Sequence, residues 1–408
     1  MASWTHKEWA HRGAMLVAGL VALAIVVVLG VATMRARHEE ESNRVRTPIP
    51  SSGPGFELAI YQALGETMHG GHDVKPINNG AIFDDLDYAI RHATSSVHVD
   101  IFIWQKSKAS DRILTAIEQR KSGVACRVIV DDLGSSHFDD DIRPRLEKAG
   151  CEARIFRPAP GQKDELARSH RKIVVIDGNL AYTGGFGIRD EWLGDGVTNE
   201  GWRDTAVKFS GPAVTEAQQA VSQHWHEAGG KLFPPEAFPG FQPDAAPPAE
   251  GTHAVFVASV GSRFASRAAR LYELVIASAK KRLWIANAYF VPPKEVLQRL
   301  EEEAAEGVDV RILLPGKKSD SNISLSSQHI EYDELVKDKI KVYEYQPSMM
   351  HAKTVVVDDE VSLVGSINFD LLSMGKLEED ALVVQDRAFN EEMARSFEQD
   401  LTHAKEIH

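Results

Sequence analysis

The stretches HRKIVVID (His170–Asp177) and HAKTVVVD (His351–Asp358) indicate the fold of this chain. Both have the pattern His-x-Lys-x-x-x-x-Asp, and both are rich in Val and Ile, which favours a β-strand. Side chains two residues apart on a strand point to the same face, so we expect each histidine to share a face with its lysine. Each aspartate lies at the opposite parity, where the strand meets a turn. We expect the two aspartates to anchor turns or ion pairs rather than to touch a substrate.

The two stretches lie at matching places in an internal repeat. Before the first stretch, apolar runs alternate with helical patterns, as in VHVDIFIW, SDRILTAIEQRKSG and VACRVIVDD. The same order returns in RAARLYELVIASAKKRLWIANAYFVPPKEVLQRLEEEAAEGVDVRILLPG. Such alternation is typical of a parallel or mixed sheet covered by helices. A long period that occurs twice predicts two homologous α/β domains around a pseudo-twofold axis.

Composition along the chain suggests the domain boundaries. Six prolines between Pro234 and Pro248 indicate an extended surface connection between the two repeats. The proposed segments are an N-terminal tail (1–12), an apolar span (13–34), a linker (35–55), a first domain (56–233), a proline-rich linker (234–251) and a second domain (252–408).

Residues 13–34 contain no charged side chain and are long enough to cross a hydrocarbon core of about 30 Å. We expect one uncleaved transmembrane helix rather than a signal peptide, whose apolar region is usually about 7–15 residues. Lys7 and Arg12 precede the span, whereas four arginines follow it at positions 35, 37, 44 and 46. This asymmetry favours a cytoplasmic body.

The charge of the chain restricts its partners. Against 46 Lys and Arg stand 59 Asp and Glu, so the formal net charge is −13. We expect no nucleic acid as partner, because gripping a phosphate backbone requires many cationic contacts. An anionic ligand therefore needs a local cationic site.

The two cysteines, Cys126 and Cys151, have no spacing typical of a metal site, and each adjoins an apolar run. We expect two buried thiols, which leave the redox compartment undecided. Trp192 and Tyr289 could line an acyl groove, but core packing is the simpler interpretation.

A second strand follows each motif and ends in a loop of small residues, LAYTGGFG at 180–187 and VSLVGSIN at 361–368. We expect Gly185, Ser366 and Asn368 to bind phosphate through backbone N–H, hydroxyl and amide groups. Lys172 and Lys353 would stabilise charge on the non-bridging oxygens. One histidine would attack phosphorus, while the other would protonate the leaving alcohol and deprotonate the incoming one.

The paired motifs resemble those of the phospholipase D superfamily. The segments AYFVPP, GVDVRILLPG, YEYQPSMMHAKTVVVD and GSINFD also make the chain similar to bacterial cardiolipin synthases, over roughly residues 75–390. The resemblance implies two phospholipase D-like αβα-sandwich domains and a reaction that needs neither metal nor cofactor. It also implies His170 as the nucleophile, His351 as general acid and then base, and a carboxylate that holds each histidine. The matching positions are Asp204 for His170 and Glu379 for His351.

Three features depart from the family pattern. Gly187 ends the first small-residue loop where the family usually has Asn. One apolar span precedes the body, whereas relatives often have two. The stretch LLSMGKLEED retains only Ser373 and Glu379 of the usual residues.

The resemblance implies a phosphatidyltransferase anchored in the bacterial inner membrane, with phosphatidylglycerol as the expected phospholipid substrate. A hydrolase that passes the same phosphatidyl group to water is the main alternative. A non-catalytic membrane scaffold is a third hypothesis, which two intact motifs disfavour. The donor lipid, the acceptor and the oligomeric state do not follow from the sequence.

Overall fold

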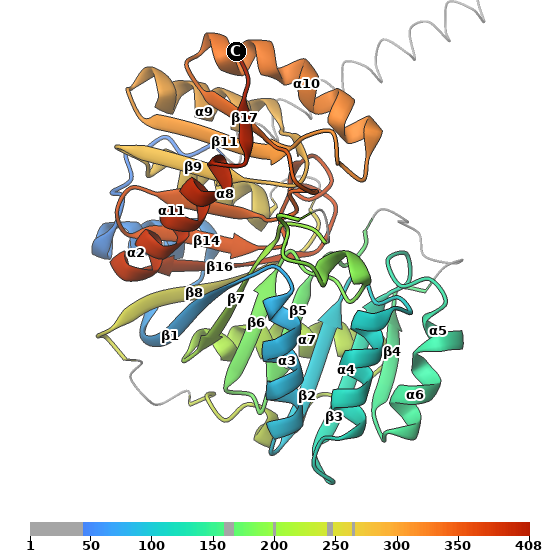
Figure 1. Ribbon diagram of the computed structural model, residues 1–408. Coiled ribbons are helices and arrows are strands. Elements are labelled where there is room, and N and C mark those ends of the chain that lie inside the picture. Colours follow the sequence, from blue (N-terminus) through green and yellow to red (C-terminus); the bar gives the residue numbers. More distant parts are fainter. Residues whose placement is uncertain (1–43, 159–166, 199–200, 243–247, 263–265) are drawn as a thin grey trace, which may run out of the picture. The chain divides into compact units, whose positions relative to one another are not determined.

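The computed structural model describes residues 44–158, 167–198, 201–242, 248–262 and 266–408 (Figure 1). The predicted tail and transmembrane helix at residues 1–34 lie outside these ranges. Within the ranges, none of the helices combines the length and the apolar character that a bilayer crossing requires. Residues from Val45 onward form one compact unit.

Fifteen strands of the described residues form one mixed sheet, in the order β17-β12-β11-β9-β13-β14-β16-β8-β1-β7-β6-β5-β2-β3-β4. We call β1 to β7 and their helices the first half, and β8 to β17 and their helices the second half. The first-half strands are β1 (His69–Asn78), β2 (Ser96–Ile101), β3 (Ala125–Asp131), β4 (Glu152–Phe156), β5 (Lys172–Ile176), β6 (Leu180–Gly184) and β7 (Thr205–Ser210). The second-half strands are β8 (Thr252–Ser259), β9 (Arg282–Ala286), β11 (Asp309–Pro315), β12 (Lys341–Tyr345), β13 (Thr354–Val357), β14 (Val361–Gly365), β16 (Glu379–Gln385) and β17 (Ala404–Glu406).

The strand order repeats outward from the antiparallel β1–β8 pair at the middle of the sheet. On one side lie β7, β6, β5, β2, β3 and β4, and on the other side lie their counterparts β16, β14, β13, β9, β11 and β12. The sequence repeat is therefore also a repeat of topology, and the mixed α/β sheet expected from the sequence is confirmed. Strands β10 (Phe290–Val291) and β15 (Phe369–Asp370) form a separate parallel pair.

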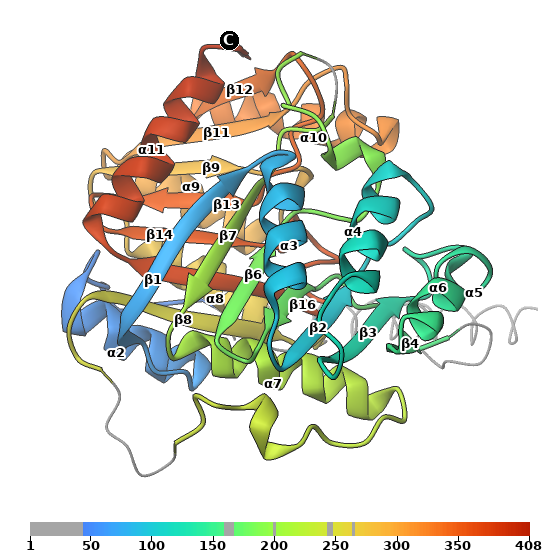
Figure 2. The same ribbon diagram turned by 60° about the horizontal axis from the view of Figure 1, so that its bottom comes forward.

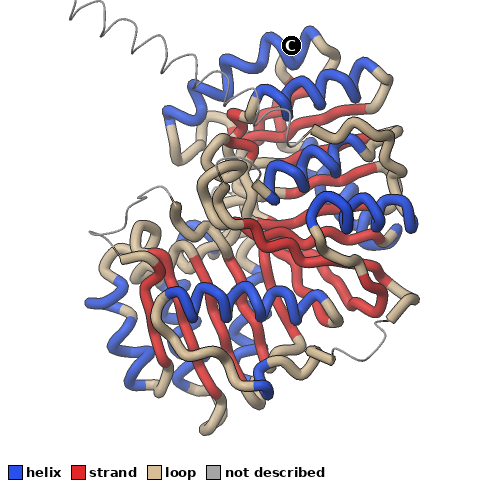
Figure 3. The backbone as a smooth tube through the Cα atoms, turned by 180° about the vertical axis from the view of Figure 1, so that it is seen from behind, coloured by secondary structure: helices blue, strands red, loops and turns tan. Residues whose placement is uncertain are grey.

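Helices cover both faces of each half (Figures 1, 2 and 3). On the first half, one face carries α3 (Ala81–His92), α4 (Lys108–Glu118), α5 (Phe138–Asp141) and α6 (Arg143–Lys148), and the other carries α7 (Ala213–Glu227). On the second half, one face carries α2 (Gly53–Leu64), α8 (Arg267–Ala277), α9 (Lys294–Ala305) and α10 (Asn322–Lys337), and the other carries α11 (Arg387–Leu401). A hydrophobic cluster around α7 and α11 contains side chains of both halves, so the halves share part of their core.

Local sequence explains where such helices begin and which face they bury. The side chain of Ser107 accepts a hydrogen bond from the backbone N–H of Ser110, which caps the first turn of α4. Ala109, Ile113 and Ile117 then recur at helical spacing and are buried against the sheet.

Residues 56–68 are placed differently from the sequence expectation. The sequence assigns them to the first domain, but Phe56, Ile60 and Leu64 of α2 pack into the core of the second half. The chain then enters β1 at the middle of the sheet. Because an amphipathic helix can bury its apolar face against either half, its sequence pattern does not identify the half it covers.

The two motif aspartates anchor turns, as expected. Asp177 and Asp358 have φ of 56° and 44°, a left-handed conformation that Asp tolerates better than most residues. The Asp177 carboxylate accepts hydrogen bonds of 2.7–3.0 Å from the backbone N–H groups of residues 94–96. The Asp358 carboxylate accepts equivalent bonds of 2.7–3.1 Å from residues 280–282. Each aspartate thus joins its motif to the start of the neighbouring strand.

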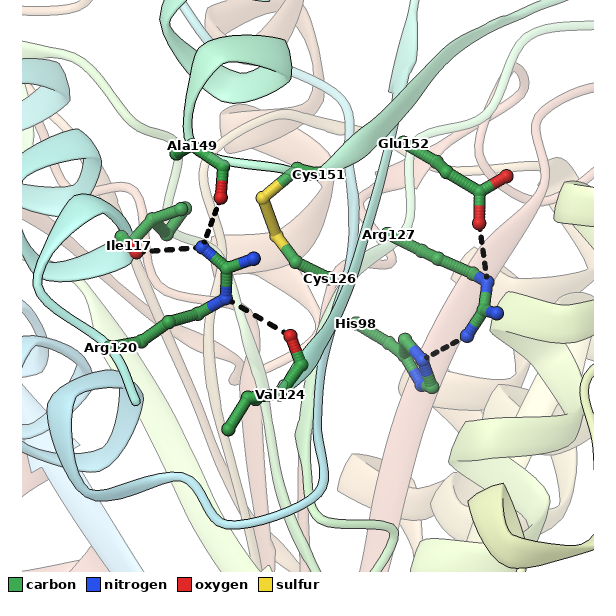
Figure 4. Close-up of a disulfide and its surroundings, with 9 residues drawn as sticks. All are labelled: His98, Ile117, Arg120, Val124, Cys126, Arg127, Ala149, Cys151 and Glu152. Atoms are coloured by element: carbon green, nitrogen blue, oxygen red, sulfur yellow. Dashed lines mark hydrogen bonds and ion pairs between the residues drawn. A yellow bond between two sulfur atoms is a disulfide. The ribbon is translucent and has the colours of Figure 1, made fainter. Parts of the chain in front are cut away.

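The prediction that the two cysteines are free thiols is wrong. Cys126 and Cys151 are buried as expected, but they form a disulfide (Figure 4). The parallel register of β3 and β4 pairs Arg127 with Glu152, so the two cysteines lie side by side one residue earlier. Nearby, Arg120 donates to backbone carbonyls of both segments. The register of β3 and β4 brings the two sulfurs together. The separation of 25 residues in the sequence does not by itself predict a disulfide.

We predict that Asp358→Ala lowers the free energy of unfolding by about 3 kcal/mol, because three backbone N–H groups lose a charged acceptor. Asp359→Ala is the matched control, since the neighbouring Asp359 makes an ion pair with Lys281 in which both side chains are largely exposed. The control should cost about 0.5 kcal/mol or less. Urea denaturation measures both changes, and equal losses would contradict the turn-anchoring role.

Candidate active site

The two motifs meet where the halves join. His170 lies two residues before β5, and its backbone N–H donates to the carbonyl of Glu378 at 2.7 Å. His351 precedes β13, and its backbone N–H donates to the carbonyl of Arg203, also at 2.7 Å. Ser169 pairs with Glu378 in a short parallel bridge. Each motif is therefore bonded through its backbone to the opposite half.

The carboxylates hold the histidines across the junction, which corrects the predicted pairing. His170 Nδ1 lies 3.0 Å from both carboxylate oxygens of Glu379, and His351 Nδ1 lies 3.0 Å from Asp204 Oδ2. The sequence paired Asp204 with His170 and Glu379 with His351. The backbone bridges explain the exchange, because they place the segment before β16 beside His170 and the segment before β7 beside His351.

Both motif lysines are buried against the histidine of their own motif. Lys172 Nζ donates to the carbonyl of His170 at 2.6 Å. Lys353 Nζ donates to the carbonyl of His351 at 2.7 Å and lies 2.8 Å and 3.0 Å from the two ring nitrogens. The His170 ring has Glu379 at Nδ1 and a hydrogen bond with the backbone of Ser366. The two histidines therefore differ in their neighbours, because both ring nitrogens of His351 lie within 3.0 Å of Lys353 Nζ.

The small-residue loops support the carboxylates. A Cβ at Gly185 would lie 2.3 Å from Asp204 Oδ1 and 2.7 Å from the carbonyl of His351, so only glycine lets that pair approach. At the matching place, the Ser366 hydroxyl donates to Glu379 and accepts from the Asp380 N–H at 2.9 Å. Gly185 and Ser366 thus contact the carboxylates of Asp204 and Glu379, respectively. From the sequence we expected both residues to contact phosphate.

Asn368 has a different environment from its two neighbours in the loops. Its side chain is 4% exposed, and its Oδ1 is buried without a hydrogen-bond partner among the described residues. A buried amide without a partner is costly unless a ligand or water completes its hydrogen bonds. Asn368 therefore stays the best candidate for a phosphate contact among the three loop residues.

Sequence reasoning missed a role for Trp192. As expected it is buried, but its indole N–H also donates to Asp204 Oδ2 at 2.7 Å. A Cβ at Gly187 would lie 3.0 Å from the Trp192 ring, so glycine replaces the family's asparagine where the tryptophan packs. The Trp202 ring packs against Trp192 with 4.6 Å between centroids, and it lies 5.0 Å from the His351 ring. The glycine at position 187, where the family usually has asparagine, was the feature of the sequence that could have indicated this role of Trp192.

Asp380 is a second residue that the sequence did not single out. Its carboxylate accepts a hydrogen bond from the backbone N–H of Lys172 at 2.9 Å and another from the Thr183 hydroxyl. These bonds attach the start of β5 and the end of β6 to the second half. Among the described residues, no cluster of three or more His, Cys, Asp or Glu side chains could hold a metal ion.

Burial determines the charge states of the site. Burial and the charges of Lys172 and Lys353 lower the pKa of His170 well below its usual value. Burial and the Lys353 charge lower the pKa of His351 to about 4, although the hydrogen bond that its ring donates to Asp204 acts in the opposite direction. Both imidazoles are therefore neutral near pH 7 in the protein alone. A neutral imidazole whose Nδ1 faces a carboxylate presents a lone pair at Nε2.

Burial also shifts the cationic and acidic groups. It lowers the pKa of Lys172 to about 8 and that of Lys353 to about 7. Burial also raises the pKa of Glu379, but the charges of Lys172 and Lys353 and the Ser366 hydroxyl oppose this rise, and positive charge developing on His170 favours the carboxylate form. An anionic phosphodiester would favour the protonated lysines and a protonated His351. The arrangement offers a nucleophile, a proton carrier and two cations around one phosphate.

We predict that kcat/KM for a chromogenic phosphodiester falls as pH rises above about 7, because the free enzyme loses the Lys353 charge. In Lys353→Arg the guanidinium stays charged, so the fall should begin instead near the pKa of Lys172, about 8. Lys208→Arg, at an ion pair with Asp85 away from the site, is the control and should keep the wild-type profile. A wild-type profile that stays flat to pH 9 would contradict the prediction.

Comparisons with known proteins found a family model and curated relatives that match both halves of the chain. The family model described as "Cardiolipin synthase, PLD-like domain" matches residues 86–224 and 273–401. Cardiolipin synthase 1 of Bacillus cereus is 33% identical over an alignment of 343 residues, and the alignment covers 81% of this chain and 66% of the relative. Cardiolipin synthase A of Pseudomonas putida is 32% identical over 337 residues, 81% of this chain and 68% of the relative. The chain thus spans about two thirds of the length of these curated relatives.

A solved structure shares the fold. Phosphatidylserine synthase of Haemophilus influenzae superimposes with a TM-score of 0.65 at 14% identity, over 86% of this chain and 92% of that chain. The family model matches each half separately, and each match contains one His-x-Lys motif. The chain therefore belongs to the family of phospholipase D-like domains that is described as "Cardiolipin synthase, PLD-like domain".

Proposed function

We propose that this protein is a phosphatidyltransferase, which moves a phosphatidyl group from one phospholipid to an alcohol acceptor through a phosphohistidine. The observation that carries the proposal is the pair of buried histidines, each held by a carboxylate of the opposite half and accompanied by a buried lysine. The names of the curated relatives support a phospholipid as substrate.

In the first step, His170 Nε2 attacks the phosphorus atom, and the bond from phosphorus to the leaving alcohol oxygen breaks. Glu379, 3.0 Å from Nδ1, stabilises the positive charge that develops on the ring. His351, which is protonated once the anionic phosphodiester is bound, delivers its Nε2 proton to the leaving oxygen. Lys353 Nζ, 3.0 Å from that nitrogen, keeps its own proton and charge.

In the second step, the hydroxyl of the acceptor gives its proton to His351, and its oxygen attacks phosphorus. The bond between phosphorus and His170 Nε2 breaks and restores the neutral imidazole. Lys172 and Lys353 stabilise the non-bridging oxygens in both steps. With phosphatidylglycerol as both donor and acceptor, the products are cardiolipin and glycerol.

We predict that the full chain converts phosphatidylglycerol vesicles to cardiolipin, and that His170→Gln lowers the rate at least about a thousandfold. Mass spectrometry of the lipid products measures this. Release of phosphatidic acid alone, without head-group exchange, would assign the protein to the hydrolases. If the folded wild-type protein formed neither cardiolipin nor phosphatidic acid, the transferase and hydrolase hypotheses would both be wrong. This result would favour the scaffold hypothesis.

The nucleophile can be identified with phosphatidyl-p-nitrophenol, whose leaving group needs no proton. With His351→Ala, the first step should proceed and the second should stall for lack of a base, so the adduct should accumulate on the His170 peptide. Phosphohistidine survives an alkaline denaturing quench, which permits peptide mapping. An adduct at position 351 in the His170→Gln variant, formed at the wild-type rate, would reverse the assignment.

We propose that residues 13–34 anchor the protein in the bacterial inner membrane, and that the body faces an oxidising compartment. The disulfide between Cys126 and Cys151 supports this side, because cytosolic reductants keep most thiols reduced. The arginines after the span favour the cytoplasmic side instead. We give the disulfide more weight, because it lies in the folded body itself, whereas the arginines flank the span.

The chain contains two cysteines, so their state in intact cells can be read from a gel shift. We predict that a maleimide-polymer reagent added on lysis labels neither cysteine unless the sample is first reduced. Double labelling without reduction would place the body in the cytoplasm. The Cys126→Ser and Cys151→Ser variants serve as single-label standards.

A further inference from the structure

A histidine outside the two motifs lies at the junction with both ring nitrogens facing carboxylates. His224, on α7, is fully buried. Its Nε2 lies 2.8 Å from Glu378 Oε2 in a hydrogen bond. Its Nδ1 lies 2.7 Å from Asp100 Oδ2, an ion-pair contact whose geometry is not that of an aligned hydrogen bond. Two carboxylates on one imidazole favour its doubly protonated form, in which both nitrogens are donors.

Glu378 is the partner that connects His224 to the site. Its carboxylate also lies 3.2 Å from an Arg171 nitrogen and 2.6 Å from an Arg157 nitrogen. The ring of Phe156 stacks on His224 with 4.1 Å between centroids. The side chain of Glu378, from the second half, is thus enclosed by groups of the first half.

The backbone of Glu378 reaches His170 directly. Its carbonyl accepts the His170 N–H at 2.7 Å, and its own N–H donates to the carbonyl of Arg168 at 2.9 Å. The next residue along the chain, Glu379, holds the His170 ring at Nδ1. A shift of the Glu378 side chain would therefore move both the backbone and the ring partner of His170.

The second histidine has a matching arrangement with different residues. Asp400 of α11, the counterpart of α7, accepts hydrogen bonds of 2.7 Å and 2.9 Å from Arg203 Nε. The carbonyl of Arg203 accepts the His351 N–H, and the next residue, Asp204, holds the His351 ring. In both cases a buried helix residue binds the residue that precedes the histidine-holding carboxylate. His224 binds Glu378, which precedes Glu379, and Asp400 binds Arg203, which precedes Asp204. The recurrence of the arrangement supports a positioning role rather than incidental packing.

We propose that His224 is a positioning residue for His170, which acts through Glu378 to hold the backbone and the Glu379 carboxylate at the geometry that nucleophilic attack requires. The proposal rests on the phosphodiester chemistry proposed above and adds a residue that belongs to neither motif. His224 itself touches neither the substrate nor the reacting atoms.

The two arrangements differ in their response to pH. Burial and Arg171 lower the pKa of His224, but Asp100 and Glu378 raise it more, so the net shift is upward. The charged and ring groups that face His224 are Asp100 on β2, Phe156 at the end of β4, Arg171 before β5 and Glu378 before β16. A raised pKa means that the ion pairs are intact below the usual histidine pKa of about 6.5 and are lost as pH rises through the folded value. In the second arrangement, Asp400 raises the pKa of Arg203 against the effect of burial, so the guanidinium stays charged.

The test compares His224→Phe and His224→Gln with His72→Gln. His72 is also a buried histidine that contacts α7, because its Nε2 accepts from the Ala213 N–H at 3.0 Å, but it has no contact with Glu378. We expect His224→Phe to slow adduct formation on His170 by roughly 10- to 100-fold with little change in KM. His224→Gln retains one donor toward Glu378 and should recover part of the rate. His72→Gln should keep the wild-type rate even where its melting temperature falls.

Nitrogen-15 NMR of histidine-labelled protein gives a readout that needs no substrate. At pH 7 the wild type should show one buried imidazolium with both nitrogens protonated, and this signal should vanish in His224→Gln. The His170 Nδ1 shift should change in the His224 variants and stay constant in His72→Gln. A neutral His224, or a His224→Gln variant with the wild-type rate and the wild-type His170 shift, would overturn the proposal. Absence of transfer by the wild type would overturn the proposed function alone, because the NMR comparison still decides the positioning role.

Discussion

The hydrogen bonds that cross between the two halves beside the motif histidines are the constraint on which the site depends. His170 and His351 donate their backbone N–H groups to Glu378 and Arg203, and the residues that follow these two hold the imidazole rings. Neither half contains a complete site, because each provides the carboxylate for the other. A change in how the halves pack therefore changes the geometry of both histidines at once, and the core cluster that the halves share keeps that packing constant.

Burial has two consequences for the chemistry. It makes the histidines neutral and lowers the pKa values of both lysines. A bound phosphodiester anion has the opposite effect, because its negative charge favours the protonated lysines and a protonated His351. It also makes each unpartnered polar group costly, which explains why the carboxylates are enclosed by donors such as Trp192 and Ser366. The net charge of −13 is compatible with an anionic substrate because Lys172 and Lys353 are buried beside the motif histidines.

Several features of the fold and the site could be predicted because they are local. The Val- and Ile-rich motifs form the expected strands, and the turn aspartates accept hydrogen bonds as their parity suggested. The repeat of strand order follows from the repeat of the sequence pattern. In contrast, the disulfide and the partners of Asp204 and Glu379 depend on contacts between segments far apart in the chain. Periodicity and spacing carry no information about which strand lies beside which.

The sequence by itself determined the reacting groups: two histidines, two lysines and carboxylates within a duplicated α/β pattern that identifies the family. Only the tertiary structure decided how these groups are connected, namely that each histidine is held by the opposite half and that His224 and Asp400 support the holding residues. The physical reason is that the sequence specifies the type of each side chain, whereas the hydrogen bonds across the junction form only when β1 and β8 pair and join the two halves.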